Sequence, residues 1–575
     1  TPKPSSAASD VYKRQEKRKN KNREFCNIIE SSYSKEGLKH LIIILTFIAF
    51  TGLVALISWY KTKEENLSTK EGYFLAGRGL TGLVIAGSLE MTNLSTEQLV
   101  GQAGQSYSTN MGAMSWSVNA SIALLALALI FLPKYLKAGI TTIPEFLESR
   151  FDRATRVIVS FIFLVAYIVT MLPLVLYAGS VAMERIFGIT ALMGGNRFMA
   201  TTVMCVALGI IGGIYAIFGG LKAIALSDSI NGLGLIVGGL LVPVFGFMFL
   251  SGQLGGDGSF MDGFDKFLHT NPSYLNAINE VNTPEPWLPW PLLFTGLLVN
   301  NMYYWATNQS IIQRTLAAKN LAQAQRGAVF TAFLKLLDPF FITICGLLAY
   351  RFFGDGLANS DLAYPSLITT VIPNWLLGII AAVLFGAILS SFNSALNSCV
   401  TLYTLDFHRP LFNQTASDAH LVSVGKRVGT GLAIVSICVA PFVINAPSGL
   451  YDFLQECFGF YSMPILAIVL VGFYTKRVPA CAPKITLVVH VILYSISKFL
   501  PLNVHYLYVL SVLFPVDLAL MLLIGKLKPR ATDFILEDSK AVDLTPWKYS
   551  KLVSVIVIVC VLLVYLAFSP LGIGA

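Results

Sequence analysis

Hydroxyl, amide and carboxylate side chains interrupt an otherwise apolar segment at Ser88-Leu-Glu-Met-Thr-Asn-Leu-Ser-Thr-Glu-Gln98. Polar groups at membrane depth are costly unless they are paired or face a cavity. A helix broken here would free backbone carbonyls to bind a cation, and such breaks are tolerated only where they line a cavity. We therefore expect a broken helix at a binding site; the alternative is the entry to a packed helix.

Amides and aromatic rings are mixed in Asn300-Asn-Met-Tyr-Tyr-Trp-Ala-Thr-Asn-Gln309. Amides hydrogen-bond hydroxyl groups, and an aromatic face covers the apolar face of a pyranose, so the segment is typical of a sugar pocket. An aromatic belt at the membrane interface is the alternative interpretation.

Serines share one helix face in Ser390-Ser-Phe-Asn-Ser-Ala-Leu-Asn-Ser398. Hydroxyl oxygens could bind sodium there, although serine equally promotes helix packing in membranes. Charged residues also occur inside the spans: Lys335 precedes Asp338 by three residues, so the two could neutralise each other, and Asp228 lies in another span. The sequence contains no Walker-A loop, no HExxH and no recognisable nucleophile–base pair, so we expect a protein that is not an enzyme.

Composition identifies the elements that must position these residues. The 575-residue chain is 55% hydrophobic and only 13% charged, and a membrane-spanning helix needs about 20 apolar residues. Because the apolar runs are continuous and do not alternate, the spans are predicted to be helices of an all-α polytopic membrane protein. We expect about fourteen spans. They lie near 39–60, 79–106, 110–136, 155–186, 198–217, 222–250, 288–310, 324–352, 374–405, 424–444, 449–472, 483–501, 504–525 and 552–569.

The formal charge of +9 fits a membrane protein better than a nucleic-acid binder, because the basic residues gather in alternate short loops. By the positive-inside rule, the loops near 61–78 and 526–551 face the cytoplasm and the loop 252–287 faces outward. Arg150, Lys222 and Arg314 are expected among the cytoplasmic loop residues.

We expect three parts in the chain: a non-native segment at 1–15, a basic tail at 16–38, and a transporter domain at 39–575.

Five motifs carry a resemblance to a known family: EGYFLAGRGL, IPEFLESRF, FGGLKAIALSDSI, NQSIIQRTLAAKN and SSFNSALNS. The chain resembles the sodium–solute symporter family from about Gly72 to Lys476, including its sodium/galactose carriers and an uncharacterised bacterial branch that shares TNLSTEQLVG. The resemblance implies a core at about 79–472, built of two inverted five-helix repeats with discontinuous first helices. Peripheral helices would lie at 39–60 and 483–569.

The resemblance also implies site residues. The sodium ligands would be the carbonyls of Met91, Leu94 and Ala387 and the hydroxyls of Ser390 and Ser391. The solute contacts would be Asn93, Gln98, Asn301, Lys335 and Gln455, with Tyr304 as an inner aromatic gate.

Some positions depart from the family's sugar carriers. The family's sugar-binding glutamate falls at Ser117 and a nearby serine at Ala120, whereas Glu90 stands where the galactose carrier is apolar. An acid could thus have moved from one pocket helix to another. A second sodium site would need Asp228, Ser390 and Ser394 together with the position of Asn393, and it stays open.

The sequence therefore predicts a sodium-coupled symporter, multi-pass in a bacterial inner membrane, that imports a small polar solute such as glucose or galactose by alternating access. Its partners would be that solute, Na⁺ and the lipid bilayer, with no nucleic acid; its oligomeric state is open. The alternatives are an acidic sugar or another organic solute, proton coupling through Glu90 or Asp228, and a transporter-like sensor.

Overall fold

The computed structural model describes residues 39–64, 67–281, 287–445, 450–500 and 504–574. The expected non-native segment and basic tail lie outside these residues. Within the described residues the fold is all-α, and β-pairing is confined to isolated bridges such as that between Leu80 and Ala318.

Most helices lie within the predicted spans, some of which consist of two consecutive helices. In chain order they are Lys39–Thr62, α3 (Gly82–Asn93), α4 (Thr96–Ser108), α5 (Ser115–Ala126), α6 (Leu132–Ala138), α8 (Arg153–Ala166), α9 (Leu172–Phe187), α11 (Arg197–Gln253), α14 (Gly296–Thr307), α15 (Gln309–Leu316), α16 (Leu321–Leu334), α17 (Ile344–Phe353), α19 (Asn374–Thr401), α21 (Asp418–Val439), α22 (Leu450–Gly459), α23 (Ser462–Tyr474), α24 (Cys481–Phe499), α25 (Tyr506–Leu527) and α26 (Ser550–Ala567). Shorter helices connect them: α2 (Lys70–Leu75), α7 (Ile143–Arg150), α10 (Ile189–Leu192), α12 (Phe260–Thr270), α13 (Pro291–Phe294), α18 (Ala363–Val371) and α20 (Arg409–Leu411).

Eleven described helices are long and apolar enough to cross a membrane, or twelve if the bent pair α22–α23 is one span. The expected number of about fourteen is not confirmed. The two predicted spans near 79–106 and 288–310 are not counted, because each forms a helix that is interrupted in the middle. The halves have 12 and 13 residues in α3 and α4, and 12 and 8 in α14 and α15, each too short to span a bilayer alone.

Gly220 separates the two predicted spans that run together as α11. Its φ of 63° lies in the region that favours glycine, and a Cβ there would meet Leu67 at 3.0 Å. The chain therefore turns from one membrane helix directly into the next at this residue.

The loops expected to be cytoplasmic contact one another. The amide of Leu80 donates to Ala317 O at 3.1 Å, that of Leu321 to Asp543 O at 3.0 Å, and that of Ser539 to Lys137 O at 2.9 Å. The loop 252–287, which is expected to face outward, contacts the end of the last helix, where Ala277 N donates to Phe568 O at 2.7 Å.

Two of the arginines counted with the loops are buried. Arg150 is 0% exposed and donates to the carbonyls of Gly472, Thr475 and Val478 at 3.1–3.2 Å, just beyond and at the end of α23. Arg314 is 1% exposed, inside the helix bundle. Counting Arg314 as a loop charge was wrong, because α15 carries it into the core.

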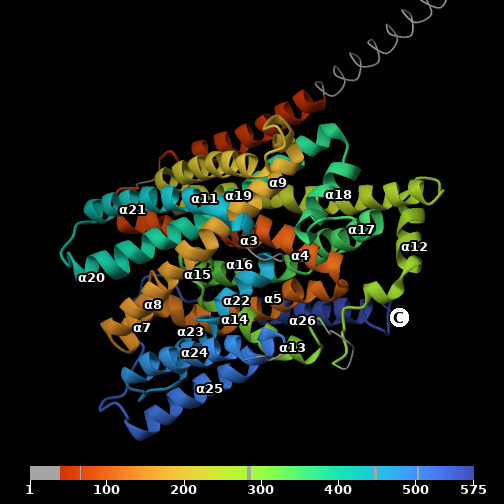
Figure 1. Ribbon diagram of the computed structural model, residues 1–575. Helices are drawn as coiled ribbons and strands as arrows, with labels where there is room; N and C mark the ends of the chain where they lie inside the picture. The colour runs from red at the N-terminus through yellow and green to blue at the C-terminus, as the bar shows by residue number, and fades with distance from the viewer. Residues whose placement is uncertain (1–38, 65–66, 282–286, 446–449, 501–503, 575) are drawn as a thin grey trace, which may run out of the picture.

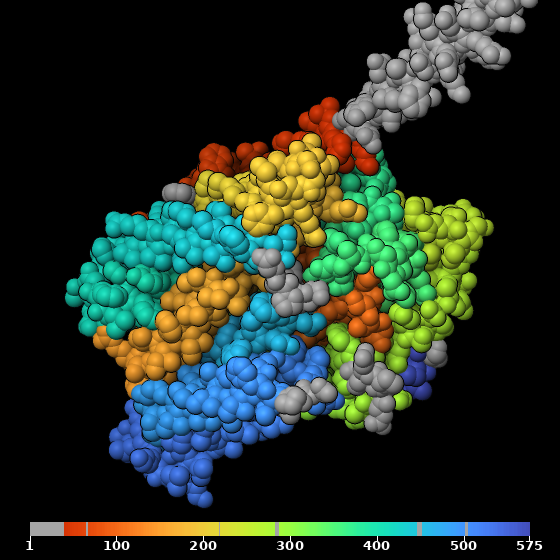
Figure 2. All heavy atoms as spheres, viewed as in Figure 1, coloured from red at the N-terminus to blue at the C-terminus, as the bar shows by residue number. Residues whose placement is uncertain are grey.

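The elements outside the expected core lie at the margins of the molecule. The helix Lys39–Thr62 runs along one edge, and α24 and α25 run along the opposite edge (Figure 1). Figure 2 shows α24 and α25 as the outermost layer on their side. The binding residues therefore lie in the bundle between these edges.

Candidate functional site: a broken helix and an amide-lined pocket

The interruption between α3 and α4 leaves backbone carbonyls without their usual partners. In a continuous helix Ser95 N–H would donate to Met91 O, and Gln98 N–H to Leu94 O. Instead, Ser95 N donates to Asn93 O at 2.8 Å and Gln98 N to Ser95 O at 3.1 Å. Because both donors are used elsewhere, the carbonyls of Met91 and Leu94 are free to bind a cation, as the polar run predicted.

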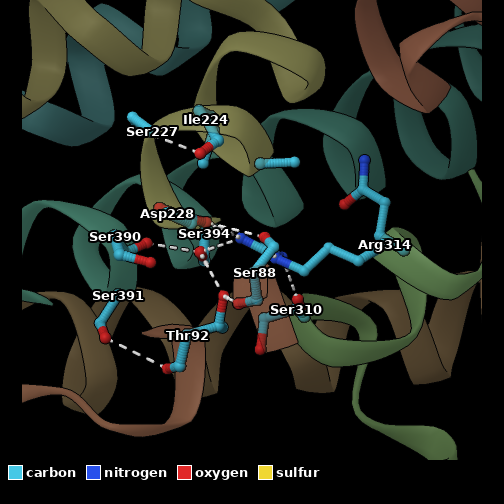
Figure 3. Close-up of polar contacts among 12 residues, drawn as sticks. Ser88, Thr92, Ile224, Ser227, Asp228, Ser310, Arg314, Ser390, Ser391 and Ser394 are labelled. Atoms are coloured by element: carbon cyan, nitrogen blue, oxygen red, sulfur yellow. Dashed lines mark hydrogen bonds and ion pairs between the residues drawn. The ribbon is translucent and has the colours of Figure 1, made fainter. Parts of the chain in front are cut away.

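Helix α19 brings its serines against this break. Ser391 Oγ donates to Thr92 O at 3.1 Å (Figure 3). Ser390 is 2% exposed, and Ala387 is fully buried on the same helix. The predicted sodium ligands are therefore contributed by two helices in contact. The atoms that would coordinate the ion are carbonyl and hydroxyl oxygens, and oxygen is the ligand atom that hard cations prefer.

A buried ion pair lies beside the break. Arg314 Nη2 is 3.7 Å from Asp228 Oδ2, and Ser88 Oγ bridges them, donating to Asp228 and accepting from Arg314 Nε, both at 2.8 Å. The guanidinium also donates to Ser310 O and Ser394 Oγ (Figure 3). Asp228 and Ser394, two residues of the possible second sodium site, are thus engaged by Arg314.

A cavity adjoins the broken helix, between α3, α4, α14 and α22. Its lining contains five of the six predicted solute contacts. The lining residues are Asn93, Glu97, Gln98, Trp116, Ala120, Met171, Asn300, Asn301, Tyr304, Trp305, Tyr451, Leu454, Gln455 and Phe458. Amides and aromatic rings dominate the wall, and the rings of Tyr304 and Trp305 meet edge to face at 5.4 Å.

Several amide oxygens in this wall have no partner. Oε1 of Gln98, Oδ1 of Asn300 and Oε1 of Gln455 are buried and make no hydrogen bond to any described residue. The amide nitrogens of Gln98 and Gln455 are used, the first on Gln102 and Ser117 at 3.3–3.4 Å and the second on Tyr451 at 3.0 Å. The pocket therefore presents hydrogen-bond acceptors to a bound solute.

Lys335 is not among the residues that line the cavity. It is fully buried, and its ammonium contacts Asp338 at 2.8 Å and Glu90 at 3.1 Å. Lys335 Nζ lies 5.6 Å from the ring centre of Trp305, which does line the cavity. The i, i+3 contact with Asp338 was expected; the contact with Glu90 was not. Glu90 faces this lysine and is not the relocated pocket acid.

Sequence reasoning missed six lining residues: Glu97, Trp116, Met171, Tyr451, Leu454 and Phe458. Glu97 belongs to the polar run already singled out, and its place directly before Gln98 was the available signal. Trp116 lies on α5 and Met171 directly before α9, whereas Tyr451, Leu454 and Phe458 share α22. Apolar and aromatic residues are common in every membrane helix, so none of these five gives a signal.

A family model described as "Sodium:solute symporter family" matches residues 73–481. The chain belongs to the sodium:solute symporter family. It is therefore a multi-pass membrane transporter of a sodium-coupled symporter family, and not an enzyme.

Curated relatives agree with this assignment. The uncharacterized symporter YidK of Escherichia coli K12 is 44% identical over 530 residues, covering 92% of this chain and 91% of that protein. The sodium/glucose cotransporter of Vibrio parahaemolyticus is 32% identical over 484 residues, covering 80% and 86%. The bovine sodium/myo-inositol cotransporter is 29% identical over 464 residues, covering 74% and 62%.

A solved structure shares the symporter fold. It is the substrate-bound outward-open state of a Na⁺-coupled sialic acid symporter, with a TM-score of 0.73 at 21% identity, covering 86% of this chain and 98% of that one. At this identity the likeness concerns the fold alone. In this chain the interruptions at Leu94–Ser95 and at Asn308 each lie in the first helix of an expected five-helix repeat.

Proposed function

We propose that this symporter imports an uncharged, polyhydroxylated solute of the monosaccharide class, such as glucose or galactose, together with Na⁺ across a bacterial inner membrane. The transporter domain would be residues 39–575, with the binding core at about 79–472. The solute would contact Asn93, Gln98, Asn301 and Gln455, with Tyr304 as the inner gate.

The unpartnered acceptors of the pocket carry this proposal. A sugar hydroxyl can donate to the free oxygens of Gln98, Asn300 and Gln455, whereas a carboxylate can only accept. Leaving a buried acceptor without a donor costs about 1–3 kcal/mol, so a donor-rich solute is favoured. The aromatic faces of Tyr304 and Trp305 would cover the apolar side of the solute.

Sodium would be held by the carbonyls of Met91, Leu94 and Ala387 and the hydroxyls of Ser390 and Ser391. Asn93, in the solute pocket, lies in the chain between two of these carbonyls. Both ligands thus bind one interrupted helix. Each would stabilise the arrangement that the other needs, and coupling is then a difference in affinity between two states of the bundle.

The relatives support the same solute class. Two are named for glucose and for myo-inositol, which are both uncharged and polyhydroxylated. The bacterial relatives favour the inner membrane as the location.

An acidic sugar is the second candidate. It would need the Lys335 ammonium as a carboxylate anchor, but Glu90 and Asp338 already hold that ammonium. Proton coupling and a transporter-like sensor are further alternatives, and no described contact favours either over sodium symport.

Uptake into proteoliposomes tests the proposal. We expect a sodium gradient to drive accumulation of a neutral hexose from a panel of hexoses, polyols, uronic acids, sialic acid and amino acids. Strong competition by sialic or uronic acids without competition by neutral hexoses would contradict it. Uptake that is independent of sodium would favour proton coupling, and binding without uptake would favour the sensor.

A further inference from the structure

Glu97 is the one charged side chain among the described residues that line the solute cavity. It sits in the first turn of α4, directly after the break that frees the sodium-binding carbonyls, and it is 6% exposed. Its Oε2 atom is buried and makes no hydrogen bond to any described residue. A carboxylate oxygen is thus directed into the pocket without a donor.

Nearby cations do not neutralise this carboxylate in the structure. Lys335 contacts Glu90 and Asp338. Arg314 contacts Asp228 and is hydrogen-bonded to serine side chains. The two buried cations beside the broken helix are each held by other acids, so the pocket wall keeps an acidic group of its own.

We propose that Glu97 is a solute-binding carboxylate, which accepts hydrogen bonds from the hydroxyl groups of the solute and excludes solutes that carry a carboxylate. The inference rests on the proposed function and makes it more specific. Together with the free oxygens of Gln98, Asn300 and Gln455, Glu97 makes the described wall rich in unpaired acceptors. Hydrogen bonds to an ionised acceptor are about twice as strong as neutral ones, so Glu97 is the strongest acceptor among them.

The same carboxylate would repel an anionic solute. A uronic or sialic acid would bring its charge close to Glu97 in a site partly shielded from water, where like charges interact more strongly than in solution. Selectivity would then arise from a repulsive element as well as from attractive contacts.

The test compares Glu97→Gln, Glu97→Asp and Glu456→Gln in sodium-driven uptake by proteoliposomes. Glu456 is a matched control, because it lies on the pocket helix α22 but is not a lining residue of the cavity and contacts Lys498 at 2.7 Å. For each protein we measure the hexose concentration at half-maximal uptake, inhibition by glucuronate, and the sodium concentration at half-maximal activation.

Glu97→Gln should raise the half-maximal hexose concentration about tenfold or more, because it replaces a charged acceptor by a neutral amide. It should also strengthen glucuronate inhibition relative to the wild type while sodium activation changes less than about twofold. Glu97→Asp should weaken hexose affinity but keep glucuronate excluded. It serves as the test if the Glu97→Gln protein does not fold into the membrane. Glu456→Gln should behave as the wild type.

Unchanged hexose affinity and unchanged glucuronate exclusion in Glu97→Gln would overturn the inference. So would a loss confined to sodium activation, because Glu97 would then act on the ion. The wild-type panel is evaluated first: if the wild type takes up no neutral sugar, the proposed function fails, whereas sugar uptake with an unaffected Glu97→Gln variant rejects the role of Glu97 alone.

Discussion

The Lys335 ammonium lies 3.1 Å from the Glu90 carboxylate, and this contact joins the end of α16 to α3, the helix that ends at the proposed sodium site. Asp338 holds the same ammonium at 2.8 Å, and all three side chains are at most 1% exposed. Lys335 therefore neutralises buried acids and does not reach the solute cavity.

Removing this cation should destabilise the protein. Lys335→Met leaves Glu90 and Asp338 buried without a partner, and breaking a buried pair from one side costs about 3–5 kcal/mol. Glu90→Gln keeps the Lys335–Asp338 contact and should cost clearly less. Thermal unfolding of the purified proteins in detergent measures both. A Lys335→Met variant with wild-type stability but no solute affinity would instead make Lys335 a solute contact.

The buried Arg314–Asp228 pair should depend on the shape of the guanidinium group as well as on its charge. Arg314 reaches Asp228, Ser88 and Ser394 at once, so Arg314→Lys should rescue little of the loss caused by Arg314→Met. We expect both variants to unfold at lower temperature than the wild type. Arg427→Lys, at an exposed position of α21, is the control and should have little effect. Full rescue by Arg314→Lys would show that charge alone matters.

Ser391→Ala should weaken sodium activation, because it removes one of few cation ligands while changing side-chain volume little. We expect the sodium concentration at half-maximal uptake to rise about tenfold, which corresponds to about 1.4 kcal/mol. Ser398→Ala on the same helix is the control, since its hydroxyl contacts Gln313 at 3.3 Å instead of the break. Unchanged sodium dependence in Ser391→Ala would remove this residue from the proposed site.

Gln98→Ala should abolish or strongly reduce solute uptake while sodium binding persists. The buried solute hydroxyl would lose its acceptor, at a cost of about 1–3 kcal/mol. Gln105→Ala is a matched control two turns along α4, because Gln105 contacts Asp452 at 2.6 Å and does not line the cavity. Equal effects of the two substitutions on uptake would argue against a solute contact at Gln98.

The orientation can be tested by cysteine labelling with an impermeant reagent. A cysteine at the exposed position Asp257 should react from outside, and one at the exposed position Ala531 only from the cytoplasmic side, because the basic loops are expected inside. The wild-type protein, whose own cysteines lie mostly within helices, sets the background. Labelling of Asp257→Cys solely from inside would reverse the proposed orientation.

The linear sequence by itself determined the fold class and the family. Continuous apolar runs of about 20 residues can only form membrane helices, because each backbone group must find its partner within the segment. The polar run at Ser88–Gln98 predicted a helix break for the same reason: so many polar groups are tolerated only beside a cavity. Motifs such as NQSIIQRTLAAKN are contiguous, so a family resemblance is visible without any structure.

Only the tertiary structure decided which charges meet. Lys335 and Asp338 are one helical turn apart and could be paired from spacing, but Glu90 is 245 residues before Lys335, and no local periodicity relates them. The sequence likewise indicates a loop position for Arg314, whereas in the structure α15 places Arg314 beside Asp228. Hydropathy reports how apolar a segment is, whereas the partner of a buried charge depends on how distant helices pack. The pocket wall with its free acceptors, and Glu97 within it, exists only once those helices are packed together.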